Sequence, residues 1–194
     1  MVNNGISQLM RASTILLLGL SLVMAGCSSY RRPPPAFHEV LTKPYRVDSG
    51  DRLRVVVYDQ EKLSTTYTID PGGTLSMPLV GDVTARGKTT KELESILETR
   101  LSKGFLRNPD VSVEVDQYRP FFIMGEVKTA GQFPYVAGLT AQTAIAIAGG
   151  FSARAQQASV DVTRQIEGEI MTARVPLSEP LRPGDTVYVR ERLF

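Results

Sequence analysis

Short segments of strand character, joined by turns rich in glycine, aspartate and proline, run through the chain from residue 45 onward, and only two segments in that region have helical spacing. β-branched residues or strict alternation of apolar and polar side chains mark each segment as a strand. Gly and Asp at the joints suit tight turns because they tolerate or stabilise unusual backbone angles. We predict strands at residues 53–58, 65–69, 74–79 with a continuation to 83, 111–115, 121–124, 159–164, 170–175 and 186–189.

The first helical segment follows residue 89. Its apolar residues recur at the spacing of one helix face, namely Leu93, Ile96, Leu97 and Leu101. Thr89 and Glu92 form a capping-box pattern at its start, and Gly104 suits its C-terminal end. In the strand before it, alternation places Leu75, Met77 and Leu79 on one face.

The second helical segment is residues 141–148, with Thr140 as its cap and Gly149-Gly150 as its end. Its small residues Ala141, Ala144 and Ala148 would let it pack closely on a sheet. Each helix is embedded among strands, so the fold class is predicted to be α+β. We expect two small mostly-β modules with one helix each, at residues 45–117 and 119–194.

Residues 1–26 have the three parts of a secretory signal: Arg11 as the positive charge, an apolar run at 14–24, and the small residues Ala25 and Gly26. The apolar run is short for a bilayer span, which needs about 20 residues. Small residues directly before Cys27 resemble the bacterial lipoprotein box, although Met24 stands where that box usually has Leu. Two alternatives are a simple secretory peptide beside a free thiol and an N-terminal membrane anchor.

The lipoprotein box implies cleavage between Gly26 and Cys27, and acylation of Cys27 by an S-linked diacylglycerol and an N-linked acyl chain such as palmitate. Ser29 at the second mature position points to the outer membrane, because the inner-membrane retention signal is an Asp there. Residues 27–44 would then be a lipidated tether. Three consecutive prolines at 33–35 predict an extended, stiff spacer. His38 lies in this tether, where a solvated side chain is favoured over a metal or catalytic role.

Four motifs in order resemble the outer-membrane polysaccharide export lipoproteins, the Wza-type family. They are the opening Tyr-Arg-Val-x-x-Gly-Asp-x-Leu at 45–53, the hairpin at 70–83, the helix start Gly-Lys-Thr-x-x-Glu-Leu at 87–93, and Asn-Pro-Asp-Val-Ser-Val at 108–113. Residues 124–133 and 144–150 resemble the SLBB domain (soluble-ligand-binding β-grasp) that follows in the same exporters. A shorter echo links Gly-Asp-Arg-Leu-Arg-Val at 50–55 with Gly-Asp-Thr-Val-Tyr-Val at 184–189, which suggests similar turn–strand solutions in both modules.

The resemblance implies a lipid-anchored component on the periplasmic side of the outer membrane that exports a capsular polysaccharide or exopolysaccharide. Its partners would be the polysaccharide, further copies in a ring-shaped homo-oligomer (an octamer in the family), an inner-membrane polysaccharide co-polymerase and a separate outer-membrane β-barrel. Longer exporters carry a further SLBB domain and a C-terminal amphipathic helix. This chain ends after the strand at 186–189 and is expected to be a minimal member without a membrane-spanning helix.

The rest of the sequence indicates neither a catalytic site nor a site for metal, nucleotide or nucleic acid. The formal charge of +2 leaves no basic surplus for nucleic acid, and one cysteine with one histidine excludes an internal disulfide and a multi-cysteine zinc site. Gly87-Lys88-Thr89 is not a Walker A loop, because Asp82 occupies the required glycine position. We therefore predict no catalytic or metal-binding residue, no cofactor and no enzyme activity.

Two alternatives to the conduit remain open. One is a monomeric periplasmic glycan-binding lipoprotein. The other is a glycan hydrolase that uses the carboxylate pairs Asp48/Asp51 or Asp70/Asp82, although aspartates beside glycine are more simply turn residues.

Overall fold

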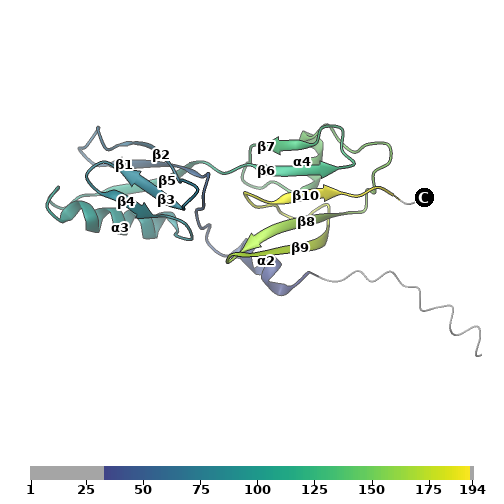
Figure 1. The fold of residues 1–194 in the computed structure, drawn as a ribbon, viewed down its shortest axis with the longest axis horizontal. Coiled ribbons are helices and arrows are strands. Elements are labelled where there is room, and N and C mark those ends of the chain that lie inside the picture. Colours follow the sequence, from purple (N-terminus) through teal and green to yellow (C-terminus); the bar gives the residue numbers. More distant parts are fainter. Residues whose placement is uncertain (1–32, 193–194) are drawn as a thin grey trace, which may run out of the picture. The chain divides into compact units, whose positions relative to one another are not determined.

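The structure of the protein is a computed structural model that describes residues 33–192 (Figure 1). The predicted signal peptide, its cleavage between Gly26 and Cys27, and the acylation of Cys27 lie outside the described residues and stay predictions. Within the described part, strands outnumber helices and each of two hydrophobic cores has its own sheet and helix. This arrangement confirms the α+β class.

The N-terminal module has a three-stranded antiparallel sheet with β1 at its centre, a separate two-stranded hairpin, and one helix that packs on β5. Alternation on β1 buries every second residue, which is why this half-apolar strand can sit between two neighbours. The elements are β1 (Arg52–Val57), β2 (Thr65–Thr68), β3 (Thr74–Met77), β4 (Gly81–Thr84), α3 (Thr90–Ser102) and β5 (Val111–Gln117).

Helix α3 begins and ends where the sequence predicts. Thr89 and Glu92 form the reciprocal capping box, with the Thr89 amide 2.8 Å from Oε2 of Glu92. Leu93, Leu97 and Leu101 are buried against the sheet. Full burial of such a side chain contributes about 1.5–3 kcal/mol, so this face fixes the helix on the module.

The expectation for Leu79 was wrong. Leu75 and Met77 are buried, but Leu79 is exposed and has a φ of +69°. Strand β3 ends at Met77, and the chain reverses through residues 78–80 into β4. The alternation therefore stops at the turn, and Leu79 belongs to the turn rather than to either strand.

The C-terminal module has one five-stranded sheet in the order β7-β6-β10-β8-β9. The pair β10 and β6 is parallel, and the other pairs are antiparallel. Helix α4 is capped by Thr140 and buries Ala141, Ala144 and Ile145, as the small-residue pattern predicts. The elements are β6 (Phe121–Gly125), β7 (Gly131–Phe133), α4 (Ala141–Ile147), β8 (Ser159–Ile166), β9 (Glu169–Pro176) and β10 (Thr186–Val189).

The predicted extended spacer was wrong for residues 35–42, which form helix α2 (Pro35–Thr42). Pro35 starts this helix, where a fixed φ and a missing N–H are tolerated. Phe37 on α2 is fully buried in the core of the C-terminal module, and α2 contacts β8. Figure 1 shows α2 beside β8 and β9, although its residues precede the N-terminal module in the chain. Burial of Phe37 outweighs the extended preference of the proline run.

His38 is exposed, as expected, with 46% of its side chain accessible, but it also has a partner in the fold. Its Nδ1 lies 3.2 Å from Oε1 of the buried Glu179, and its ring packs edge-on to Phe37 with 5.8 Å between centroids. His38 therefore lies at the edge of the docked face of α2, beside the buried Phe37. Among residues 33–192, no helix is both long and apolar enough to cross a membrane.

Candidate functional site

Two turns of the same geometry, residues 48–51 and 182–185, dominate the polar interior of the described chain. In each, the amide of the closing aspartate donates to the carbonyl of the first residue, at 3.1 Å for Asp51 and 3.1 Å for Asp185. In each, the aspartate carboxylate accepts the amide of the first residue at 2.8 Å. Gly50 and Gly184 have φ of +89° and +86°, a region that glycine enters at little cost. The sequence echo between the modules is thus a repeated turn.

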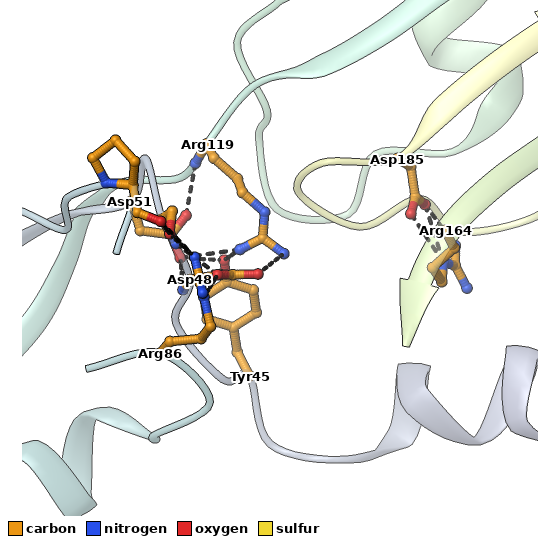
Figure 2. A network of polar contacts seen from close by, with 9 residues as sticks. Tyr45, Asp48, Asp51, Arg86, Arg119, Arg164 and Asp185 are labelled. Atoms are coloured by element: carbon orange, nitrogen blue, oxygen red, sulfur yellow. Dashed lines mark hydrogen bonds and ion pairs between the residues drawn. The ribbon is translucent and has the colours of Figure 1, made fainter. Parts of the chain in front are cut away.

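Asp51, in the first turn, collects four hydrogen bonds around a fully buried carboxylate. Besides the turn amide, it accepts the Tyr45 hydroxyl at 2.6 Å, the Arg119 amide at 2.8 Å and Nη1 of Arg119 at 3.2 Å. Arg119 lies in the connection between β5 and β6. Figure 2 shows its guanidinium beside Asp51 and Asp48, above the Tyr45 ring. Asp51 therefore ties the first module to the start of the second.

Arg119 packs against the glycine of each turn, but only at Gly184 would an added Cβ meet it too closely. A Cβ at Gly50 would lie 3.5 Å from Cβ of Arg119, and a Cβ at Gly184 would lie 2.7 Å from its Nε. The first distance is ordinary contact, whereas the second is a collision. Arg119 thus passes between the two turns, and its packing needs the bare backbone of Gly184.

Asp48, the first residue of its turn, is also engaged. Its Oδ1 accepts Nε of Arg86 at 2.8 Å and the amide of Ser49 at 2.7 Å. Partial burial by itself favours the neutral acid, but the bonds from Ser49 and Arg86 and the charge of Arg119 hold the pKa of Asp48 below its usual range. Asp48 is therefore a fixed carboxylate rather than a proton donor.

Asp185, in the second turn, pairs with Arg164 of β8, and both side chains are buried. Nε of Arg164 donates to Oδ1 at 3.0 Å and Nη2 to Oδ2 at 2.7 Å, a two-point contact. The remaining donors reach the carbonyls of Phe37 at 2.8 Å and Pro180 at 3.0 Å. Cζ of Arg164 lies 4.4 Å from the centre of the Phe37 ring. This pair therefore holds α2 as well as the turn.

A cavity of about 550 Å³ lies between these two clusters and the end of α2, and we call it the junction cavity. Its wall comes from the segments 40–48, 86–87, 119, 164–168 and 182–185. Positive side chains outnumber negative ones in this wall. The positive ones are Lys43, Arg46, Arg86, Arg119, Arg164 and Arg182, and the negative ones are Asp48, Glu167 and Asp185.

Arg182 differs from the other arginines of the wall. Each of them lies within 4.0 Å of a carboxylate, but the Arg182 guanidinium has no carboxylate partner and no hydrogen bond among residues 33–192. Its Cζ lies 5.9 Å from the centre of the Tyr45 ring. Burial, and next the like charge of Arg164, lower the pKa of Arg182. The site can therefore attract an anion, and it shows no nucleophile paired with a base.

Asp70 and Asp82, the second carboxylate pair considered from sequence, bond to different partners. Asp70 accepts the amide and hydroxyl of Thr74 at 2.8 Å and 2.6 Å, whereas the Asp82 carboxylate accepts the Ser76 hydroxyl. Both are local turn and hairpin contacts, as are those of Asp48 and Asp51 within their turn. The turn interpretation is confirmed for Asp48, Asp51 and Asp70, whereas Asp82 lies in strand β4 opposite Ser76.

Sequence reasoning missed the three arginines that matter most here: Arg119, Arg164 and Arg182. One of them left a signal. In β8 the inward positions are Val160, Val162, Arg164 and Ile166, so an arginine stands in an apolar register and calls for a buried partner. Arg119 and Arg182 lie outside regular elements, where periodicity says nothing.

Comparison with known proteins assigns each module. Residues 40–116 match the family described as polysaccharide biosynthesis/export protein, and residues 119–189 match the SLBB domain. The exopolysaccharide production protein ExoF of Rhizobium meliloti (strain 1021) is 35% identical over 156 residues, which cover 74% of this chain and 35% of ExoF. The EPS I polysaccharide export outer membrane protein EpsA of Ralstonia solanacearum is 28% identical over 207 residues, covering 88% of this chain and 55% of EpsA.

The fold and the matches together define a two-module α+β protein, with an export domain followed by an SLBB domain. The chain belongs to the polysaccharide biosynthesis/export family. It spans about a third of the length of ExoF and about half that of EpsA. The family consists of export components and not of enzymes, in agreement with the prediction that the chain is not an enzyme.

Proposed function

We propose that this protein is an outer-membrane lipoprotein that forms part of the conduit for an exopolysaccharide or capsular polysaccharide. Acylation of Cys27 would anchor it, and the modules at 45–117 and 119–194 would face the periplasm. The protein would guide the glycan by exchangeable polar contacts rather than by chemistry.

One observation carries this proposal: the export domain and the SLBB domain follow each other directly in one chain, at residues 40–116 and 119–189. The name of the relative EpsA, a polysaccharide export outer membrane protein, supports the same compartment and cargo. The interior of the two modules also fits, because the buried carboxylates of Asp51 and Asp185 are committed to arginines and backbone amides instead of to a catalytic pair.

The partners stay predictions from the resemblance. We propose a ring-shaped homo-oligomer, an inner-membrane co-polymerase that delivers the glycan, and a separate outer-membrane β-barrel that receives it. A ring closed by head-to-tail contacts uses two different surface patches of each copy, as a conduit requires.

Deletion of the gene tests the function. We expect loss of surface polysaccharide while its repeat units are still synthesised, and restoration by the wild-type gene. Normal export in the deletion strain would refute the proposal. The mass of the detergent-solubilised acylated protein separates the conduit from the alternative of a monomeric glycan-binding lipoprotein: a defined oligomer supports the ring, whereas a monomer at all concentrations supports the alternative.

The lipid anchor has its own test. A Cys27→Ser protein should fold, because the two hydrophobic cores are built from residues between 37 and 189, and it should fail to restore export in the deletion strain. Mass spectrometry of the wild-type N-terminal peptide should show the acyl chains. A wild-type protein that keeps an unmodified Cys27 thiol would contradict the anchor.

A further inference from the structure

We propose that the junction cavity binds a monocarboxylate sugar, such as a uronic acid residue of an acidic glycan, with the guanidinium of Arg182 as its anion-binding group. The inference rests on the proposed function for the source of the sugar. The cavity, its charge and the state of Arg182 carry the rest.

The charge of the cavity fits one negative group. The wall holds six cationic and three acidic side chains. Two further carboxylates stand directly behind it, because Asp51 pairs with Arg119 and Glu92 pairs with Arg46. The surplus that remains is a single positive charge. A single carboxylate balances this surplus, whereas a dianionic phosphate would overcompensate it.

Arg182 supplies that charge in a form ready for a ligand. The aspartate of its own turn, Asp185, is occupied by Arg164 and accepts only the backbone amide of Arg182. The guanidinium lies over the Tyr45 ring and is partly buried without a hydrogen-bond partner among the described residues. A carboxylate matches the planar guanidinium with two parallel hydrogen bonds. An anionic ligand would therefore pair with the one arginine of the wall that has no carboxylate partner among the described residues.

The size and lining of the cavity fit a sugar ring better than a bare ion. Its volume of about 550 Å³ lies in the range of about 300–1,000 Å³ that is usual for small-molecule sites. Val40 and Ile166 add apolar groups to the polar ones of the wall. A pyranose ring presents the same mixture, with C–H faces and hydroxyl edges.

The cavity would also connect ligand binding to α2. Val40 and Lys43 lie at the end of α2, Arg86 belongs to the first module, and Arg182 belongs to the second. A ligand that contacts all three segments binds only when α2 is docked. Ligand binding is therefore expected to protect the amides of α2 from hydrogen exchange.

The test is calorimetric titration of the full-length detergent-solubilised protein at low ionic strength. The probes are a tetrasaccharide of alternating glucuronate and N-acetylglucosamine, its neutral counterpart of N-acetylglucosamine alone, and inorganic phosphate. We expect the acidic tetrasaccharide to bind and the neutral one to bind at least about tenfold more weakly, since one charged hydrogen-bonded contact is worth that much. The affinity should fall as salt is added, because part of it is charge attraction.

Arg182→Gln is the decisive variant, and Arg107→Gln is its matched control. Both remove one guanidinium, but Arg107 is exposed and lies outside the cavity wall. Arg182→Gln keeps the backbone amide that closes the turn, so its thermal unfolding should match that of the wild type. It should weaken binding of the acidic tetrasaccharide about tenfold or more, whereas Arg107→Gln should leave the affinity unchanged.

Three results would overturn the inference: no binding of the acidic tetrasaccharide, equal loss in both variants, or tighter binding of inorganic phosphate than of the tetrasaccharide. These results are distinct from failure of the proposed function. If the deletion strain loses surface polysaccharide but the pure protein ignores the acidic tetrasaccharide, export stands and the sugar site falls. If the protein binds the sugar but the deletion strain exports normally, the sugar site stands and the proposed export function falls.

Discussion

The two Gly–Asp turns have the same backbone but opposite surroundings. Both close with a buried aspartate that accepts its own turn amide and an arginine. In the first turn the arginine is Arg119, whose side chain keeps 22% of its surface exposed, and in the second it is Arg164, which keeps 2%. The first residues of the two turns carry opposite charges, with Asp48 in one turn and Arg182 in the other.

The difference shows that the same turn geometry stabilises two different parts of the molecule. The first turn uses Asp51 to hold the connection between the modules, through both the amide and the side chain of Arg119. The second uses Asp185 and Arg164 to hold helix α2, through the carbonyl of Phe37. Because Asp48 is paired and Arg182 is not, the second turn alone leaves a free charge toward the junction cavity.

The largest expected effect is at the second turn. Asp185→Asn should lower the free energy of unfolding by about 3–5 kcal/mol, because Arg164 then keeps a buried charge without a counterion. Urea denaturation of the full chain, followed by circular dichroism, measures this loss. The double variant Arg164→Met/Asp185→Asn is the control and should recover part of the stability. A single variant as stable as the wild type would show that Arg164 finds another partner.

Removal of the Phe37 ring comes next. Phe37→Ala should cost about 3 kcal/mol at the lower end of the range for buried aromatic residues, since α2 can detach instead of leaving a void. Hydrogen exchange should rise in α2 and stay unchanged in α3, which belongs to the other core. His38→Ala is the milder control, because it removes the contacts of His38 with Phe37 and Glu179 but keeps the Phe37 ring. Equal exchange in α2 of the wild type and Phe37→Ala would contradict its docking by this side chain.

Much of the fold follows from local signals in the sequence. β-branched content locates β1, alternation locates β5, the capping box locates α3, and small residues with Thr140 locate α4. The Gly–Asp echo also predicts that the two turns resemble each other. These features depend on neighbours within a few positions, which is why a sequence reading finds them.

The candidate site depends on contacts between distant residues. Arg164 and Phe37 lie 127 positions apart, and Arg119 and Asp51 lie 68 apart. Helix α2 is held in place because Phe37 is buried in the core of the C-terminal module. The proline run before Phe37 does not indicate this burial. The same holds for Arg182, whose importance comes from the absence of a nearby carboxylate in the described structure. No local pattern encodes such a pairing.

The first turn should respond less than the second to the same substitution. Asp51→Asn should lower the free energy of unfolding by about 1.5–3 kcal/mol, the usual contribution of hydrogen bonds to a charged group. Arg119 can turn to water or to Asp48, whose Oδ2 lies 3.9 Å from Nη2. Urea denaturation beside Asp185→Asn provides the comparison. A loss at Asp51 that equals or exceeds the loss at Asp185 would show that burial of the arginine does not set the difference.

The smallest effect is a pH dependence at Asp48. Because its pKa is lowered in the folded state, the stability that it contributes is complete above the ordinary aspartate pKa of about 3.9 and is lost as the pH falls through the lower folded value. Asp48→Asn removes this contribution. The wild type should therefore exceed Asp48→Asn in stability at about pH 6, and this advantage should already be smaller near pH 3, below the ordinary pKa.

Thermal unfolding at both pH values measures the difference between the two proteins. Ser49→Ala is the control within the same turn, since it keeps the backbone amide that bonds to Asp48 and changes no charge. The advantage at neutral pH should be modest, because the Arg86 partner of Asp48 is half exposed and solvent screens such pairs. If the advantage of the wild type grew as the pH fell, the pKa of Asp48 would be raised and not lowered by folding. Asp48 would then be hydrogen-bonded as the neutral acid, and its contrast in charge with Arg182 would be lost.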